Sequence, residues 1–274
     1  MIKWRLLDTG AMPASLNMAI DEALLQLHVP GESQPALRFY QWSPPAVSLG
    51  YFQKRHSIDL TACRERGIDV VRRATGGRAV LHENDLTYSV IADSMQGIPS
   101  SLDAAYRLLC KGLLAGFRLL GFGAELGRER VRSPQADICF VRAAIGDIVY
   151  QGRKFVGSAQ TWQGSSLLQH GSIILEPQEN TWSAIIKTDT DSNGSLREKL
   201  KSRIISLREI LGRGIEPGEL KQAIRAGMAE ALQVELHAGE LSPREWALAK
   251  GIAEGKTLTG ETHGYSENQP AVLV

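Results

Sequence analysis

One segment of the chain reads Val71-Arg72-Arg73-Ala74-Thr75-Gly76-Gly77-Arg78-Ala79-Val80-Leu81-His82, and it joins a pair of arginines to a glycine turn between two apolar runs. Adjacent glycines accept positive φ angles and allow backbone N–H groups to approach a ligand closely. The flanking arginines and the histidine add positive or protonatable groups. The segment therefore predicts the wall of a pocket for an anionic or acyl-carbonyl ligand. The alternative is a β-hairpin in which Gly76-Gly77 only closes the turn and the arginines lie in solvent.

Outward from this segment, apolar periodicity and turn residues predict a mixed set of elements. Helices are expected over Ser15 to His28, with Ser15 as the cap, over Leu60 to Arg66 and over Leu102 to Leu120. Strands are expected over Leu37–Trp42, Ala46–Tyr51, Val70–Arg73, Ala79–His82, Leu86–Ile91, Asp147–Tyr150, Lys154–Gln160 and Leu167–Leu175. This pattern predicts an α+β fold with helices packed on a mainly antiparallel sheet.

The remainder of the chain has a different composition. Residues Thr188 to Ser195 form a polar stretch typical of a linker. Helices are predicted over Leu207–Leu211, Pro217–Leu232 and Ser242–Ala253, and the residues after Gly260 are expected to form a loose tail. We therefore predict a main domain over residues 1–187, and over 188–274 a linker and a small helical C-terminal part packed on that domain.

Composition excludes several classes of protein. With 274 residues and a formal net charge of +1, the chain lacks the bulk basicity of a nucleic-acid-binding protein. It contains no uninterrupted apolar run of membrane-spanning length and no signal-peptide core, so we expect a cytoplasmic protein without membrane contact. The cysteines Cys63, Cys110 and Cys139 are odd in number and show no Cys-x-x-Cys spacing, which predicts neither a disulfide framework nor a metal site.

Two further segments carry small and polar residues in strand-like surroundings: Gly152-Arg153-Lys154-Phe155-Val156-Gly157-Ser158-Ala159-Gln160 and Gln169-His170-Gly171-Ser172-Ile173-Ile174-Leu175. Together with the arginine and glycine segment, and in this order, they resemble the lipoate-protein ligase and octanoyltransferase family, which is related in fold to biotin-protein ligases. The similarity extends from about Trp4 to Leu175. It includes Ser15 to Ala23 and Ser48 to Gln53.

Within this family, Cys139 followed by Phe140 upstream of Gly152-Arg153-Lys154 resembles the octanoyltransferase branch, whose nucleophile lies in a loop before the sheet. The resemblance implies that Cys139 is the nucleophile and that Lys154 assists it. A cysteine thiol with a pKa near 8.5 is only about 3% ionised at pH 7, so it needs a nearby cation. The alternatives are a small buried Cys139 and a solvated Lys154. Cys63 and Cys110 are predicted to be packing residues.

The remaining candidates are assigned to substrate binding: Arg73, Gly76, Gly77, Arg78, His82, Gly157, Ser158, Ala159, His170 and Gly171. Glycine and alanine in strands can leave an apolar groove for an acyl chain, although tight packing of a helix on the sheet explains them equally well. Either histidine could orient a reacting group near neutral pH, or form a structural hydrogen bond to a backbone carbonyl.

The resemblance implies a cofactor-free transfer of an octanoyl group from octanoyl-acyl carrier protein to a lysine of a lipoyl domain, through a thioester on Cys139. Three alternatives use the same residues differently or not at all. They are an ATP-dependent lipoate-protein ligase, an octanoyl amidotransferase between lipoyl domains and a non-catalytic binder of acylated partners. Residues Val141 to Asp147 depart from the usual Pro-Ser-x-Tyr-Glu pattern of the family, which bears on donor and acceptor preference. The oligomeric state is left open.

Overall fold

The computed structural model describes residues 2–54, 57–127, 146–187 and 193–256. Cys139 lies outside these residues. So do the first part of the predicted linker and the predicted tail after Gly260.

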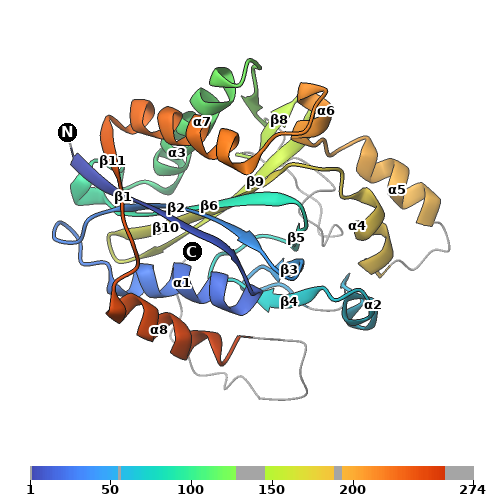
Figure 1. Ribbon diagram of the computed structural model, residues 1–274, viewed down its shortest axis with the longest axis horizontal. Coiled ribbons are helices and arrows are strands. Elements are labelled where there is room, and N and C mark those ends of the chain that lie inside the picture. Colours follow the sequence, from blue (N-terminus) through green and yellow to red (C-terminus); the bar gives the residue numbers. More distant parts are fainter. Residues whose placement is uncertain (1, 55–56, 128–145, 188–192, 257–274) are drawn as a thin grey trace.

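The main sheet has eight strands in the order β11-β1-β2-β6-β10-β9-β8-β7 (Figure 1). Their bounds are β1 Ile2–Met12, β2 Ala36–Trp42, β6 Asp85–Asp93, β7 Glu125–Leu126, β8 Ile148–Tyr150, β9 Arg153–Gln163, β10 Ser166–Ile174 and β11 Val234–Ala238. The β11–β1 and β1–β2 pairings are parallel, and all other pairings within this sheet are antiparallel. The predicted mainly antiparallel sheet is therefore confirmed, although β1, β7 and β11 were not predicted.

A second sheet contains three strands, β3 Ala46–Leu49, β4 Asp69–Arg72 and β5 Val80–His82. Strand β3 lies between the other two, parallel to β4 and antiparallel to β5. The strands on either side of Gly76-Gly77 therefore do not pair with each other. The alternative of a hairpin closed by the two glycines is wrong.

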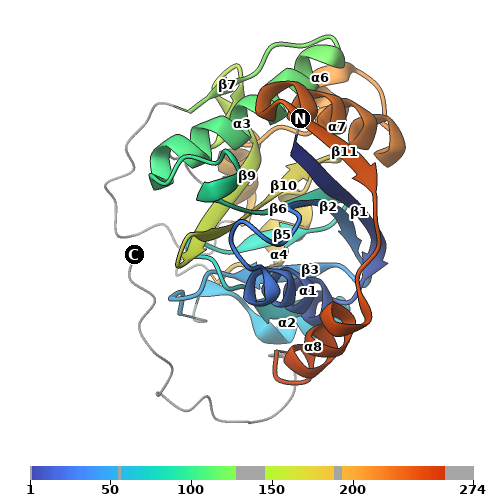
Figure 2. The ribbon, with the colours of Figure 1, turned by 90° about the vertical axis from the view of Figure 1, so that its left-hand side faces the viewer.

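Helices cover both faces of the main sheet. Helices α3 and α7 pack together on one face, whereas α1 and α8 pack on the other face, on the side of the three-stranded sheet (Figures 1 and 2). The helices are α1 Ala14–Leu27, α2 Leu60–Glu65, α3 Leu102–Leu119, α4 Glu179–Ile185, α5 Asn193–Lys201, α6 Leu207–Leu211, α7 Pro217–Leu232 and α8 Pro243–Ala253. The predicted helices are all present, and α4 and α5 are additional.

The start of α1 differs from the prediction. The N-cap of α1 is Pro13, not Ser15, and no side chain caps this end. The backbone N–H of Asn17 donates to the carbonyl oxygen of Pro13 at 3.0 Å, so the helix begins one residue before the expected serine cap. Proline and its neighbour can start a helix because the first N–H groups have no partner within the helix.

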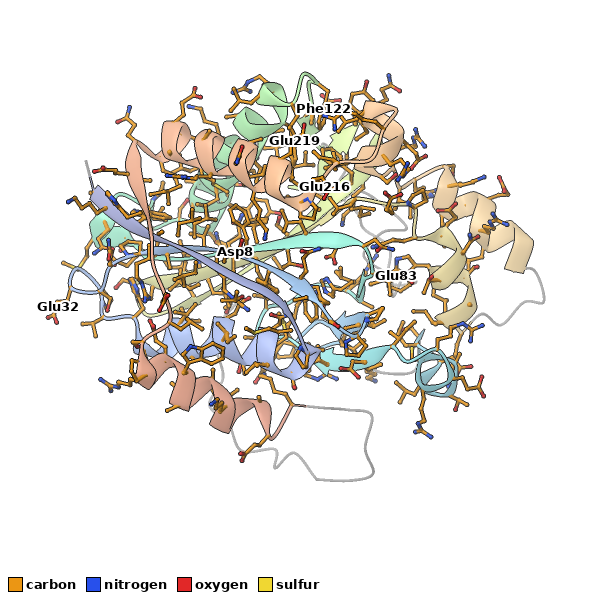
Figure 3. All side chains as sticks on the ribbon, in the orientation of Figure 1. Asp8, Glu32, Glu83, Phe122, Glu216 and Glu219 are labelled. Carbon is orange, nitrogen blue, oxygen red and sulfur yellow. The ribbon has the colours of Figure 1, made fainter. Side chains whose placement is uncertain are left out.

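Helices α3 and α7 approach closely because glycines occupy their contact. A Cβ atom added at Gly227 would collide with the backbone of Gly116 and Gly112. Cys110 on α3 and Cys63 on α2 are both buried and free of disulfides, which confirms their prediction as packing residues. Phe122, labelled in Figure 3, lies just beyond α3 and stacks on Phe117 with ring centroids 5.5 Å apart. Its ring also meets Tyr150 on β8 and Phe155 on β9.

The C-terminal part contributes a strand as well as helices. Between α7 and α8 the chain forms β11, which pairs with β1 at the edge of the main sheet. Lys221 on α7 also forms a 2.7 Å ion pair with Asp8 on β1, which is labelled in Figure 3. The description of this part as a linker and helices is thus wrong in two details, because β11 was missed and Asn193 already belongs to α5. The division after residue 187 stays a prediction.

Among the described residues, neither a membrane-spanning helix nor a metal site is found. None of the helices there combines the length and the apolarity needed to span a bilayer. In the same residues no group of three His, Cys, Asp or Glu side chains is placed to hold a metal ion.

Candidate active site

A cavity of about 420 Å³, its open mouth included, lies between the two sheets and beside α1. We call it the smaller cavity. Its lining is mostly apolar, with aromatic rings and small strand residues, and it consists of Met18, Tyr40, Trp42, Ser48, Arg73, Gly77, Val80, His82, Thr87, Gly157, Ser158, Ala159, His170, Gly171 and Ser172. Eight of the residues predicted to bind substrate are in this set.

A second hollow, the larger cavity, adjoins the first and has a volume of about 1,810 Å³, its opening to solvent included. The two cavities share Gly77, Ser158 and Ala159, and Gly76 lines the larger one. Of the ten predicted binding residues, only Arg78 lies outside both linings. The glycine turn therefore stands at the boundary between the two cavities.

Strand register explains why the small residues meet at one place. Across β9 and β10, Gly157 pairs with Ser172, Ser158 with Gly171 and Ala159 with His170. Gly171 is also paired with Tyr88 on β6, and the Tyr88 hydroxyl lies 2.8 Å from Ser158 Oγ. Successive residues point to opposite faces, so three small residues in β9 leave space beside the larger side chains of β6 and β10.

Gly171 is the most confined of these positions. A Cβ atom added there would lie 2.7 Å from Tyr88 Cε1 and 2.9 Å from the carbonyl oxygen of Gly157. We expect Gly171→Ala to lower the free energy of unfolding by about 1–3 kcal/mol, measured by urea denaturation, because overpacking displaces rigid neighbours. Gly76→Ala is the matched control, since an added Cβ there has nothing within 4 Å. Equal stability of the two variants would contradict this account.

His170 is held by a buried network on the α1 side of the sheet. Its Nδ1 atom lies 3.0 Å from Asp21 Oδ2, and its Nε2 atom lies 2.7 Å from Thr75 Oγ1. Asp21 also accepts hydrogen bonds from Arg38 at 2.7 Å and from the Tyr40 hydroxyl at 2.8 Å. His170 was expected either to orient a reacting group or to bond to a backbone carbonyl, but the partner that fixes its ring is the Asp21 carboxylate.

The charge of Asp21 is stabilised by these contacts. Burial alone raises the pKa of its carboxyl group, but Arg38 together with hydrogen bonds from His170 and Ser89 lowers the pKa below its ordinary value. Asp21 is therefore ionised at neutral pH, and the Arg38–Asp21 pair is almost completely buried. Such a pair depends on both partners, because either one alone would be a buried, uncompensated charge.

His82 lies in a second network of the same form. Its Nδ1 atom is 2.9 Å from Asp85 Oδ2, its Nε2 atom is 2.8 Å from Ser48 Oγ, and its ring stacks on Trp42 with centroids 3.9 Å apart. Asp85 is held in turn by Thr87 and Ser172. Burial lowers the pKa of His82 despite the opposing effect of Asp85, so this imidazole is neutral at pH 7.

Arg73 connects the two networks. Its guanidinium group donates to Thr75 Oγ1, to Ser48 O and Oγ, and to the carbonyl oxygens of Gly76 and Arg78. These contacts engage all five of its N–H donors. Each histidine Nδ1 atom faces a carboxylate, which can only accept, so a ring proton lies on Nδ1. Arg73 therefore holds the glycine turn, and its role as a substrate ligand stays a prediction.

Lys154 is fully buried, so the alternative of a solvated lysine is wrong. Its Nζ atom forms a 2.9 Å ion pair with Asp147 Oδ1, and Asp147 lines the larger cavity. Its backbone is bonded to Arg203 and Ile205, which fixes this end of β9. Any nearby group therefore experiences the positive charge of Lys154 together with the negative charge of Asp147.

The carboxylates of this site were not predicted from the sequence. Asp21 lies in the segment that carries the family resemblance, one turn after Asn17, and the two polar residues interrupt an otherwise apolar helix face. Buried polar residues at this spacing indicate a hydrogen-bonded network. Asp85 follows His82 by three residues, but nothing in that spacing predicts that the two side chains meet. Asp147 had no signal beyond its position at the start of a strand.

A family model described as the lipoyl protein ligase A/B catalytic domain matches residues 13–229. The chain belongs to this family. An octanoyltransferase LipM of Kyrpidia tusciae is 41% identical over 261 residues, which are 92% of this chain and 95% of the relative. An octanoyltransferase LipM of Moorella thermoacetica is 43% identical over 248 residues, covering 88% and 91% of the two chains. Like these relatives, the chain is an acyltransferase.

Solved structures support the same fold. A bipartite lipoate protein ligase from Thermoplasma acidophilum, described together with its E2 lipoyl domain, superposes with a TM-score of 0.79. Its sequence identity is 23%, and the match covers 93% of each chain. The α+β architecture predicted for this family member is therefore the lipoate-protein ligase fold.

Proposed function

We propose that this acyltransferase takes an octanoyl group from octanoyl-acyl carrier protein, holds it as a thioester on Cys139 and passes it to a lysine of a lipoyl domain. The observation that carries the proposal is the similarity to octanoyltransferases LipM at 35–43% identity over nearly the whole chain. The acceptor is supported by the family and by the fold shared with a ligase described with its lipoyl domain.

The smaller cavity is suited to an acyl chain. It is apolar over most of its lining, as small-molecule sites commonly are. Trp42 and Val80 supply apolar surface, and Gly157 and Ala159 of β9 place little side-chain volume in the lining. An eight-carbon chain gains free energy for each methylene removed from water, about 0.8 kcal/mol.

The segment that carries Cys139 starts and ends at the larger cavity. Gly127 and Gly146, the described residues on either side of it, both line that cavity. They are held together because the N–H of Gly127 donates to the carbonyl oxygen of Asp147 at 2.7 Å. Tyr106 on α3 donates to the carbonyl oxygen of Gly146 at 3.1 Å. This anchoring supports Cys139 as the nucleophile of the adjoining acyl site.

The reaction needs a thiolate, which Lys154 favours and Asp147 opposes. Burial first, and Asp147 second, raise the pKa of the nearby Cys110 thiol to about 12. Lys154 is not among the residues that line either cavity. Its assignment as the residue that assists Cys139 therefore rests on the family resemblance and stays a prediction.

Both chemical steps are balanced without a nucleotide. The Cys139 thiolate attacks the carrier thioester, a new carbon–sulfur bond forms, and the carrier leaves as a thiolate. The acceptor amine then attacks the enzyme thioester, the carbon–sulfur bond breaks, Cys139 is released, and the proton lost from the amine restores its thiol as the amide forms. A free carboxylate is not activated in this way and would need adenylation first.

Whether the reaction requires ATP therefore tests the proposed function. We expect the purified protein to add one octanoyl group to an apo-lipoyl domain from octanoyl-acyl carrier protein, without ATP or magnesium, as measured by intact mass. Free octanoate or lipoate, supplied with ATP and magnesium, should give no modification. Robust modification from free lipoate and ATP would instead support the ATP-dependent ligase.

A further inference from the structure

Two aromatic side chains are exposed directly after β3. Phe52 is 73% exposed and Tyr51 is 39% exposed, and their rings meet edge to face with centroids 4.8 Å apart. Single exposed apolar residues are common on proteins, but a pair of aromatic rings beside a functional site is typical of a protein–protein contact.

The backbone that presents these rings is fixed. Arg72 Nη1 donates to the carbonyl oxygens of Gly50, Tyr51 and Gln53 at 2.6, 2.8 and 2.9 Å. The N–H of Tyr51 donates to the carbonyl oxygen of Thr75 at 2.9 Å. A surface held in this way loses little conformational entropy when a partner binds.

This loop also lies against the glycine turn of the active site. A Cβ atom added at Gly50 would overlap the carbonyl group of Gly77, so the two backbones are in close contact. Gly77 lines both cavities. A macromolecule bound to the Tyr51–Phe52 rings would therefore stand at the boundary between the acyl cavity and the larger cavity.

The two chain segments beside the glycine turn carry charge of one sign. Residues 48–54 and 70–82 contain Lys54, Arg72, Arg73 and Arg78 and no aspartate or glutamate. Lys54 is exposed and follows the aromatic pair by two residues. A surface of this kind attracts an acidic partner and repels a cation.

We propose that Tyr51, Phe52 and Lys54 form the docking surface for the acidic carrier protein that delivers the acyl thioester. This inference rests on the proposed function. The carrier presents its thioester on an arm that contains a phosphodiester, and the negative charge of the arm suits the basic boundary. The acceptor brings a lysine ammonium to the same point, which the positive charges disfavour. Charge complementarity therefore assigns this surface to the donor.

Two kinetic parameters separate donor from acceptor, because each substrate of a ping-pong enzyme has its own kcat/KM. We expect Phe52→Ser combined with Lys54→Glu to lower kcat/KM for octanoyl-acyl carrier protein at least about tenfold and to change kcat/KM for the lipoyl domain less than about twofold. Acylation by the small uncharged thioester octanoyl-N-acetylcysteamine should be unchanged. The matched control is Leu119→Ser with Lys111→Glu, two exposed residues on α3.

Binding of fluorescently labelled holo-carrier protein, measured by anisotropy, gives a readout independent of turnover. The Phe52→Ser, Lys54→Glu protein should bind at least about tenfold more weakly than the control variant. Equal binding by the two proteins would overturn the proposal, and so would a loss confined to the lipoyl-domain kcat/KM. If the unaltered protein binds the carrier through this surface but accepts no octanoyl group from it, the proposed function fails and the docking surface stands.

Discussion

Replacing Cys139 by alanine is expected to abolish the octanoyl adduct and to lower the rate of octanoyl transfer about 10³-fold or more, because the thioester intermediate can no longer form. The adduct on the unaltered protein should be labile to hydroxylamine, as thioesters are. Intact mass before and after incubation with octanoyl-acyl carrier protein measures both effects.

Cys63→Ala is the matched control for this experiment. Cys63 is a fully buried cysteine on α2, and burial, with a smaller contribution from Asp59, raises the pKa of its thiol to about 11. The Cys63→Ala protein should keep the adduct. An octanoyl adduct that persists in Cys139→Ala would place the nucleophile on another residue, and transfer without any adduct would exclude the thioester route.

Asp21→Asn is expected to lower the free energy of unfolding at pH 7 by about 3–5 kcal/mol, because it leaves the buried Arg38 guanidinium without its carboxylate. The substitution also places an amide donor against groups that already donate to Asp21, among them the Tyr40 hydroxyl. Urea denaturation of the two proteins measures the difference. Asp103→Asn is the control, because its ion pair with Arg107 is exposed and its loss should change stability little.

The same pair has a defined pH dependence. The pKa of Asp21 is lower in the folded protein than in the unfolded chain, so its contribution to stability is complete above the unfolded pKa and is lost as the pH falls through the folded pKa. The difference between the unaltered protein and Asp21→Asn should therefore be constant near neutral pH and shrink in acid. A difference that grows in acid would contradict an ionised Asp21.

The two histidine networks show which residues hold His170 and His82 in place. Asp21 and Asp85 each orient one imidazole, and Arg73 donates to the Thr75 and Ser48 hydroxyl groups that contact the two rings. Cavity walls with fixed hydrogen-bond directions cost little reorganisation when a ligand enters. We infer that Arg73 and the carboxylates keep the acyl site rigid, while the basic boundary receives the charged part of the donor.

Local sequence determined much of this protein. Periodicity placed α1, α3 and the central strands within a few residues, because the repeat of apolar residues reflects which face of an element is buried. The small residues of β9 could be recognised as a gap in a sheet, since strands otherwise favour larger side chains, whereas the close packing around Gly171 could not. The three ordered motifs were sufficient to indicate the family, which the comparisons confirmed.

Only the tertiary structure decided which side chains meet. His170 and Asp21 are 149 residues apart, and their contact depends on how α1 packs across β10. Strand β11 pairs with β1 from the other end of the chain, so a segment that follows a long helix completes the edge of the first sheet. Lys154 resembled a solvated lysine by composition, but the fold buries it against Asp147. Local patterns record burial and backbone geometry, whereas the partner of a buried charge is set by packing between distant elements, and no short segment contains that information.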